Sequence, residues 1–155
     1  MIAELKQRAT ENPNDPEILA TIGEAQFTEL RAMGPSIDSD AMMVLAMQAD
    51  QNFADALKID PSNWEAQFVR TMARYHWPAN PQSDNETVQQ LSSLIDQQET
   101  MASQPLFPET YILLGAEYQK IGQPDKAVAT WQLGLVKYPN NLTLQKRIPP
   151  IPESQ

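Results

Sequence analysis

One stretch of 34 residues, 108–141, limits the fold more than any other part of the chain. It reads PETYILLGAEYQKIGQPDKAVATWQLGLVKYPNN. In its first half, Tyr111 and Tyr118 fall on one face of a helix, and Gly115 is small enough for a neighbouring helix to approach closely. The sequence GQPD at 122–125 then ends this helix and begins another, because proline suits the first helical turn. The stretch therefore predicts two antiparallel helices packed against each other.

The spacing of residues in these two helices resembles the tetratricopeptide repeat (TPR) family. Its pattern runs from an aromatic residue through Leu-Gly, Tyr, Ala and a second aromatic residue to a late Pro. Gly134 departs from the pattern, since Ala is usual there; we expect a cost of about 1 kcal/mol in helix propensity and no change in packing. The resemblance implies an all-α fold, a right-handed superhelix of antiparallel helix pairs. The matching residues are Tyr111, Leu114, Gly115, Tyr118, Ala127, Trp131 and Pro139.

A shared helix-end signature divides the rest of the chain. It occurs as ENPND around Pro13, IDPSN around Pro61 and KYPNN around Pro139, at intervals of 48 and 78 residues. With a 34-residue period, these intervals indicate two repeats with insertions of about 14 and 10 residues before one of full length. We therefore predict one domain over 1–155. Its parts are a capping helix (1–15), repeat 1 with an insertion (16–63), a diverged repeat 2 (64–107), consensus repeat 3 (108–141), a capping helix (142–148) and an extended tail (149–155).

The two repeats with insertions carry the least regular sequence. In repeat 2 we expect a helix over 64–77, a loop over 78–85 and a second helix capped by Asp84 or Asn85. In repeat 1 the insertion is rich in methionine. These side chains either fill an irregular core or form an adaptable surface for a partner or a second copy. They are Met33, Met42, Met43 and Met47.

Composition narrows the classes of partner. Twenty acidic residues against eleven basic ones give a net charge of −9, which repels nucleic acids and anionic membranes. The excess acid is either a solubilising surface or a preference for a basic partner. No run is apolar enough to span a membrane, and charges appear within six residues of Met1. We expect a cytoplasmic protein, or a periplasmic one if a signal or anchor upstream of Met1 has been removed.

The residues needed for enzyme chemistry are scarce. His76 is the only histidine and there is no cysteine, so neither a metal site of the usual kind nor a thiol nucleophile is available. The five glycines are isolated and form no phosphate-binding loop. The acidic residues are scattered without the pairing that acid–base catalysis needs. We expect no enzyme activity, no catalytic residue, no metal and no cofactor.

The TPR resemblance implies a concave groove lined by the first helix of each pair, which is the usual peptide-binding site of the family. Family members that clamp a C-terminal carboxylate use Lys and Asn at positions where this chain has other residues, so that clamp is missing. We expect a groove that prefers an apolar or aromatic segment of a protein partner. The groove residues expected by matching repeats are Ala20, Glu24, Phe27, Thr28, Phe68, Met72, Tyr75, His76, Ile112, Ala116, Gln119 and Lys120.

Three functions remain open from the sequence. The first is a non-enzymatic scaffold or adaptor that binds a peptide segment in the groove, and the wider sequence pattern resembles bacterial TPR scaffold proteins. The second is a homo-oligomeric structural module built through the methionine-rich insertion. The third is a chaperone-like factor that holds the C-terminal segment of a client, because residues 4–27 also resemble the TPR domains of bacterial cytochrome c assembly factors.

Overall fold

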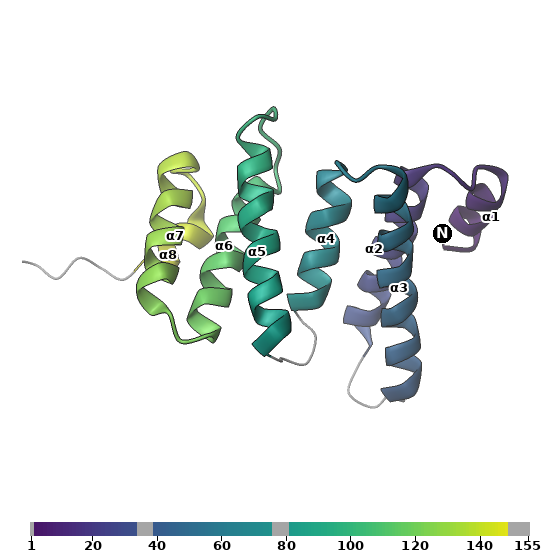
Figure 1. Ribbon diagram of the computed structural model, residues 1–155, viewed down its shortest axis with the longest axis horizontal. Coiled ribbons are helices and arrows are strands. Elements are labelled where there is room, and N and C mark those ends of the chain that lie inside the picture. Colours follow the sequence, from purple (N-terminus) through teal and green to yellow (C-terminus); the bar gives the residue numbers. More distant parts are fainter. Residues whose placement is uncertain (1, 34–38, 76–80, 149–155) are drawn as a thin grey trace, which may run out of the picture. The chain divides into compact units, whose positions relative to one another are not determined.

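Eight α-helices and no strand make up the described residues, 2–33, 39–75 and 81–148, of a computed structural model (Figure 1). This all-α architecture is the one expected from the sequence. The helices are α1 (Ile2–Glu11), α2 (Pro16–Ala32), α3 (Ser39–Ile59), α4 (Trp64–Tyr75), α5 (Pro81–Gln98), α6 (Phe107–Lys120), α7 (Pro124–Lys137) and α8 (Leu142–Arg147).

The three turns that share the sequence signature are closed in the same way. In each, the residue two positions after the proline caps the next helix. The carboxylate of Asp15 accepts a hydrogen bond from the backbone N–H of Ile18 at 3.2 Å. The side-chain oxygens of Asn63 and Asn141 accept from the N–H three residues later, at 2.9 and 3.0 Å. These caps satisfy N–H groups that a helix leaves without partners at its start, which fixes where α2, α4 and α8 begin.

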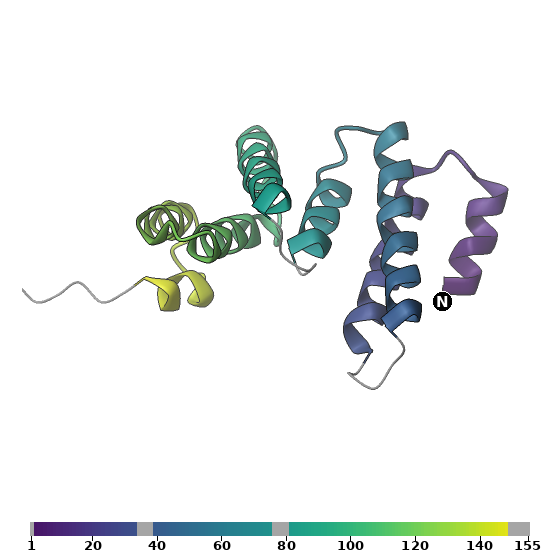
Figure 2. The same ribbon diagram turned by 60° about the horizontal axis from the view of Figure 1, so that its bottom comes forward.

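The chain divides into two compact units, Met1–Ala73 and Arg74–Gln155, and each is described by itself. In unit 1, α2 and α3 run side by side (Figures 1 and 2). Phe53 of α3 is 1% exposed and packs against Gly23 of α2, where a Cβ would lie 2.9 Å from the ring. Trp64 stacks on Phe68 along α4, with ring centroids 5.1 Å apart. Aromatic side chains therefore fill the core of unit 1.

In unit 2, α6 and α7 pack closely around Trp131. The indole N–H of Trp131 donates to the carbonyl of Ile112 at 3.2 Å, and a Cβ on Gly115 would lie only 2.1 Å from the same nitrogen. Gly134 is restricted too, though less tightly, because a Cβ there would lie 2.7 Å from Cβ of Tyr111. Gly134 was expected only to cost helix propensity; the structure adds that alanine would not fit here unless Tyr111 shifted. Both glycines of this helix pair are needed for close approach.

One boundary in repeat 2 differs from the sequence prediction, and another lies outside the described residues. Helix α5 begins at Pro81, so residues 81–85 are helical and neither Asp84 nor Asn85 is its cap. Proline is well suited to a first helical position, and here that preference outweighed the turn-forming residues after it. Helix α4 ends at Tyr75, and residues 76–80 lie outside the described part, as does the predicted tail 149–155. The single domain with three repeats stays a prediction.

Candidate functional site

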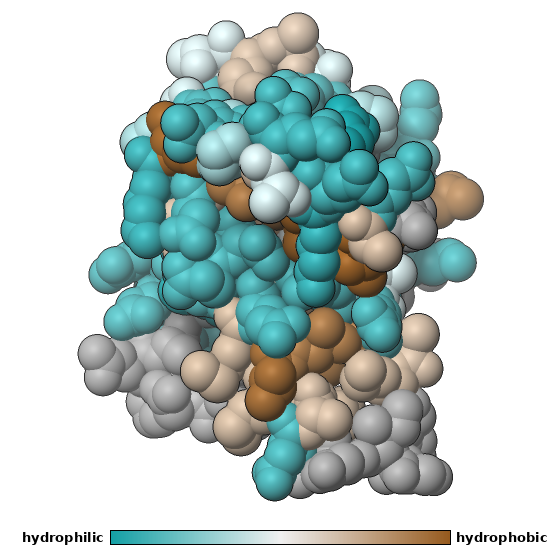
Figure 3. Space-filling view, turned by 90° about the vertical axis from the view of Figure 1, so that its right-hand side faces the viewer, coloured by the Kyte–Doolittle hydropathy of each residue, from teal (hydrophilic) through white to brown (hydrophobic). Residues whose placement is uncertain are grey.

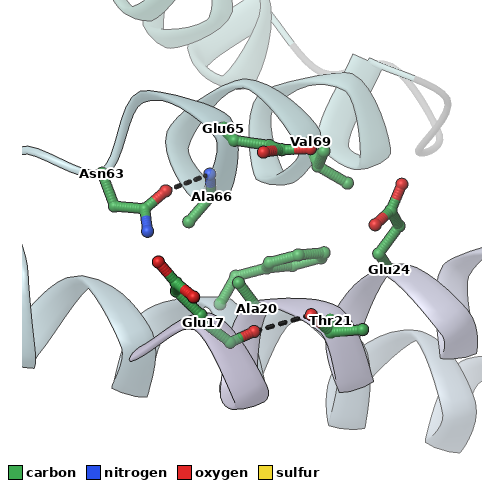
Figure 4. A pocket seen from close by; sticks show the side chains of 9 residues that line it. Glu17, Ala20, Thr21, Glu24, Asn63, Glu65, Ala66 and Val69 are labelled. Carbon is green, nitrogen blue, oxygen red and sulfur yellow. Dashed lines mark hydrogen bonds between the residues drawn. The ribbon is translucent and has the colours of Figure 1, made fainter. Parts of the chain in front are cut away.

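A groove of about 310 Å³ lies within unit 1, between α2 and the start of α4 (Figure 4). On the α2 side the lining residues recur at positions 17, 20, 21 and 24, which is the spacing of one helix face. On the other side, α4 contributes a short stretch just after its cap. The full lining is Glu17, Ala20, Thr21, Glu24, Phe53, Asn63, Glu65, Ala66 and Val69.

The upper parts of the groove walls are acidic. Glu17 and Glu24 rise from α2, and Glu65 extends along the facing wall from α4 (Figure 4). All three side chains are exposed. Among the residues that the structure describes, none of these carboxylates has a lysine or arginine partner. The groove therefore carries negative charge that is open to a cation from outside.

The floor of the groove is small and apolar. Phe53 is almost fully buried beneath it, and Ala66 and Val69 are buried in the α4 wall. Two polar groups near the floor are already engaged. Asn63 accepts from the N–H of Ala66, and the hydroxyl of Thr21 donates to the carbonyl of Glu17 at 2.7 Å. These bonds use the side-chain oxygen of Asn63 and the hydroxyl hydrogen of Thr21. The apolar floor and the carboxylates above it are then the main features that a ligand would meet.

Two of the groove residues expected in unit 1, Ala20 and Glu24, line this groove. Phe27 and Phe68 are 4% and 1% exposed and belong to the core, so their rings have almost no surface for a ligand. Met72 is half-buried and lies outside the lining. The groove thus lacks the aromatic surface that the sequence analysis expected, although the part of each residue in binding stays a prediction.

The remaining expected residues belong to unit 2 or are not described. Lys120 lies 5.7 Å from the ring centroid of Tyr75, a cation–π contact. Its Nζ is 2.6 Å from Oδ1 of Asp84 and 3.4 Å from Oε1 of Glu117. Gln119 is exposed. His76 lies outside the described residues, so its predicted place in a groove has no structural description.

Glu117, which pairs with Lys120, is unexpected because it is a buried carboxylate. It is 0% exposed, its Oε2 has no hydrogen-bond partner among the described atoms, and burial raises its pKa against the opposing effect of Lys120. Glu117 lies two residues after Gly115. The equivalent positions in repeats 1 and 2, two residues after Gly23 and Thr71, are Ala25 and Ala73. Glutamate at a position where the other two repeats have alanine is the sequence signal that distinguishes Glu117.

The sequence analysis also missed Glu17 and Glu65, which lie on the groove rim. Both are first-turn residues next to the caps Asp15 and Asn63, and acids at a helix start are commonly explained by the helix dipole alone. Their position in a shared groove depends on how α4 packs over α2. That packing cannot be read from either helix by itself.

The described residues contain no group of three metal-binding side chains. Within the same ranges, no helix is long and apolar enough to cross a membrane. What the groove offers is a narrow apolar floor between carboxylates, which suits binding by contact and charge.

The chain matches no protein-family model and no curated protein. Its fold does match a solved structure, described as TTC0263, a thermophilic TPR protein of Thermus thermophilus. The match has a TM-score of 0.73 at 18% sequence identity and covers 94% of this chain and 68% of that one. At 18% identity, the structural similarity is evidence for a shared fold and not for a shared function. Together with the repeat motif in 108–141, it shows that this chain has the all-α fold of the tetratricopeptide repeat proteins.

Proposed function

We propose that the chain is a non-enzymatic protein-interaction module, and that it holds an extended segment of a partner protein in the groove between α2 and α4. The observation that carries this proposal is the groove itself, whose three exposed carboxylates stand around an apolar floor. TPR folds typically serve as interaction modules, which supports a binding role over catalysis.

The chemistry of the groove favours a segment with lysine or arginine over the apolar or aromatic segment expected from the sequence. Basic side chains would meet Glu17, Glu24 and Glu65 on the rim, while small side chains between them would fit the floor at Ala20 and Ala66. Each exposed ion pair adds only about 0.2–1 kcal/mol. The affinity of a basic peptide for this groove is therefore expected to be modest and to decrease as the salt concentration rises.

The size of the groove limits how much of a partner it holds. Glu17 and Glu24 are seven residues apart on α2, a span of about 10 Å at the rise of an α-helix. An extended peptide covers that distance with about three residues. Residues 1–73 also hold twelve acidic and five basic side chains, and thus seven of the nine net negative charges of the chain. This field would speed the approach of a basic partner.

The same carboxylates count against one alternative. A factor that held the C-terminal segment of a client by its carboxylate would need cations in the groove, and this groove presents Glu17, Glu24 and Glu65 instead. A free chain end placed there would be repelled. An internal basic segment is the better fit.

Peptide binding measured by fluorescence anisotropy tests the proposal. The probe is a short fluorescein-labelled peptide with lysine at every second position and alanine between, compared with versions that carry glutamate or leucine in place of lysine. The full chain should bind the lysine peptide best. The double variant Glu24→Gln/Glu65→Gln, which removes one carboxylate from each wall, should weaken binding by about fivefold.

The matched control is Glu4→Gln/Glu11→Gln, which removes the same charge from exposed positions on α1. It should leave the affinity within about twofold, because general attraction by the acidic unit is weaker than a local ion pair. If both double variants lose the same affinity for the lysine peptide, the effect comes from the net charge of the chain and not from the groove. If the leucine peptide binds more tightly than the lysine peptide, the groove has the apolar preference expected from the sequence and the proposed basic preference is wrong.

A further inference from the structure

A second surface of unit 1, away from the groove, exposes large apolar side chains on α3. Met43, Val44 and Met47 are 60%, 54% and 62% exposed. Met47 lies one turn after the adjacent residues Met43 and Val44, so the three side chains form one continuous stripe, whereas Phe53 further along the same helix is buried. In Figure 3, apolar atoms gather in the lower half of this side of unit 1. We call Met43, Val44 and Met47 the methionine stripe.

An open groove continues the methionine stripe towards α2. Val44 belongs to both, since it lines a depression of about 480 Å³ together with Met33 and Leu45. Glu29 and Asp40 also line this depression. The result is an apolar strip along a helix, with a shallow channel beside it whose lining includes two acidic side chains.

The surface comes from the insertion in repeat 1. Helix α3 is 21 residues long and α2 is 17, whereas α1 has 10 and α4 has 12. The extra turns lie where α2 ends and α3 begins, and neither α1 nor α4 is long enough to run beside the whole of α3. Exposed apolar groups of this kind, with polar residues around them, are typical of interaction sites.

We propose that the methionine stripe and the channel beside it bind an amphipathic helix of a partner protein, with leucine-like residues on its apolar face and lysine or arginine at its margins. A helix fits because its own side-chain ridges pack along a groove between two helices. Thioether side chains adapt to differently shaped partners. The exposed carboxylate of Glu29 in the channel lining complements basic margins.

A second copy of the chain is a poorer occupant. A twofold contact would place Glu29 and Asp40 of both copies in one interface, and no lysine or arginine among the described residues that line the depression would be there to meet them. Each copy would also bring the seven net negative charges of residues 1–73. This proposal does not depend on the groove between α2 and α4, and the two can fail separately.

The test uses the full chain and a synthetic fluorescein-labelled helical peptide with leucine on one face and lysine on the other. Two comparison peptides carry glutamate for lysine, or the same residues with the leucines spread around the helix. The triple variant Met43→Gln/Val44→Thr/Met47→Gln keeps side-chain size and removes apolar surface. It should weaken binding of the lysine peptide by at least about tenfold. The single variant Met47→Gln should show a smaller loss in the same direction.

Control variants separate this surface from others. Leu133→Gln/Val136→Thr changes side chains of unit 2 that are 60% and 80% exposed, and should leave the affinity unchanged. Glu24→Gln/Glu65→Gln, in the other groove, should also have no effect. Undiminished binding to the triple variant would overturn the proposal, and so would equal binding of the glutamate or rearranged peptide. If light scattering shows a dimer that the triple variant turns into a monomer, a second copy is the occupant and the proposal is wrong.

Discussion

Replacing Gly115 by alanine tests how closely α6 and α7 must approach. A Cβ at this position would lie 2.1, 2.5 and 2.6 Å from Nε1, Cε2 and Cδ1 of Trp131. Ordinary contacts are about 3.5 Å or longer, so the ring would have to retreat by more than about 1 Å. Trp131 is 4% exposed and surrounded by core residues, so the retreat displaces its neighbours as well.

The expected size follows from three contributions. Overpacking a well-filled core costs about 1–3 kcal/mol. Displacing Trp131 also loses its hydrogen bond to Ile112, which contributes about 0.5–1.5 kcal/mol. Alanine gains about 1 kcal/mol over glycine in helix propensity. Gly115→Ala should therefore lower the free energy of unfolding by about 1–3 kcal/mol, although alanine is the better helix former.

Urea unfolding followed by circular dichroism measures this change, and Gly23→Ala is the matched comparison. It gains the same helix propensity, but its Cβ would lie 2.9 Å from a ring edge of Phe53, a much smaller overlap. Its effect should be at least about 1 kcal/mol smaller. In the background of Trp131→Phe, which removes the indole nitrogen, Gly115→Ala should be better tolerated. If Gly115→Ala is as stable as the parent chain, the close approach described here is incorrect.

Two further changes have clear expected results. Asn141→Ala removes the cap of α8 and should cost about 1 kcal/mol in urea unfolding, whereas Asn140→Ala, whose side chain caps no helix, should change stability by less than about 0.5 kcal/mol. Glu117→Gln should change how stability depends on pH. Because burial raises the pKa of Glu117 above the ordinary value of 4.5, its proton is held more tightly in the folded chain, and stability falls as pH rises from 4.5 through the folded pKa. Lys120 on α6 and Asp84 on α5 face this carboxyl, but only Glu117 is removed by the substitution. The stability of the parent chain relative to the glutamine variant should therefore decrease over this range, and a difference that is independent of pH would contradict the reasoning.

Local signals predicted the helices well wherever a cap or a proline was decisive. The starts at Pro16, Trp64 and Pro124 follow from residues within a few positions of each boundary. The start of α5 at Pro81 was missed, because asparagine, serine and aspartate after the proline also suit a turn. Local sequence could not decide between a helix start at Pro81 and a turn that continues to Asn85.

The groove was harder to predict for a different reason. Helix α4 is apolar on a broad face, so its periodicity alone does not show which side meets its neighbours. Phe68 was expected in the binding groove, yet its ring stacks on Trp64 and both side chains are buried in the core. The lining instead comes from Glu65 and Val69, on another part of the helix. Assigning a face to α4 required the packing of three helices at once.

The repeated turns have a consequence for the order of folding. In each one the cap bond spans three residues, and in two of them a glutamine six residues after the proline, Gln67 or Gln145, also donates to the proline carbonyl. Contacts between residues so near in sequence close small loops at little entropic cost. The turns around Pro61 and Pro139 can therefore form while the chain is still largely unpacked. A helix joined to such a turn has its first residue fixed before its partner helix arrives, so its interior can change by mutation without shifting the register of the next repeat.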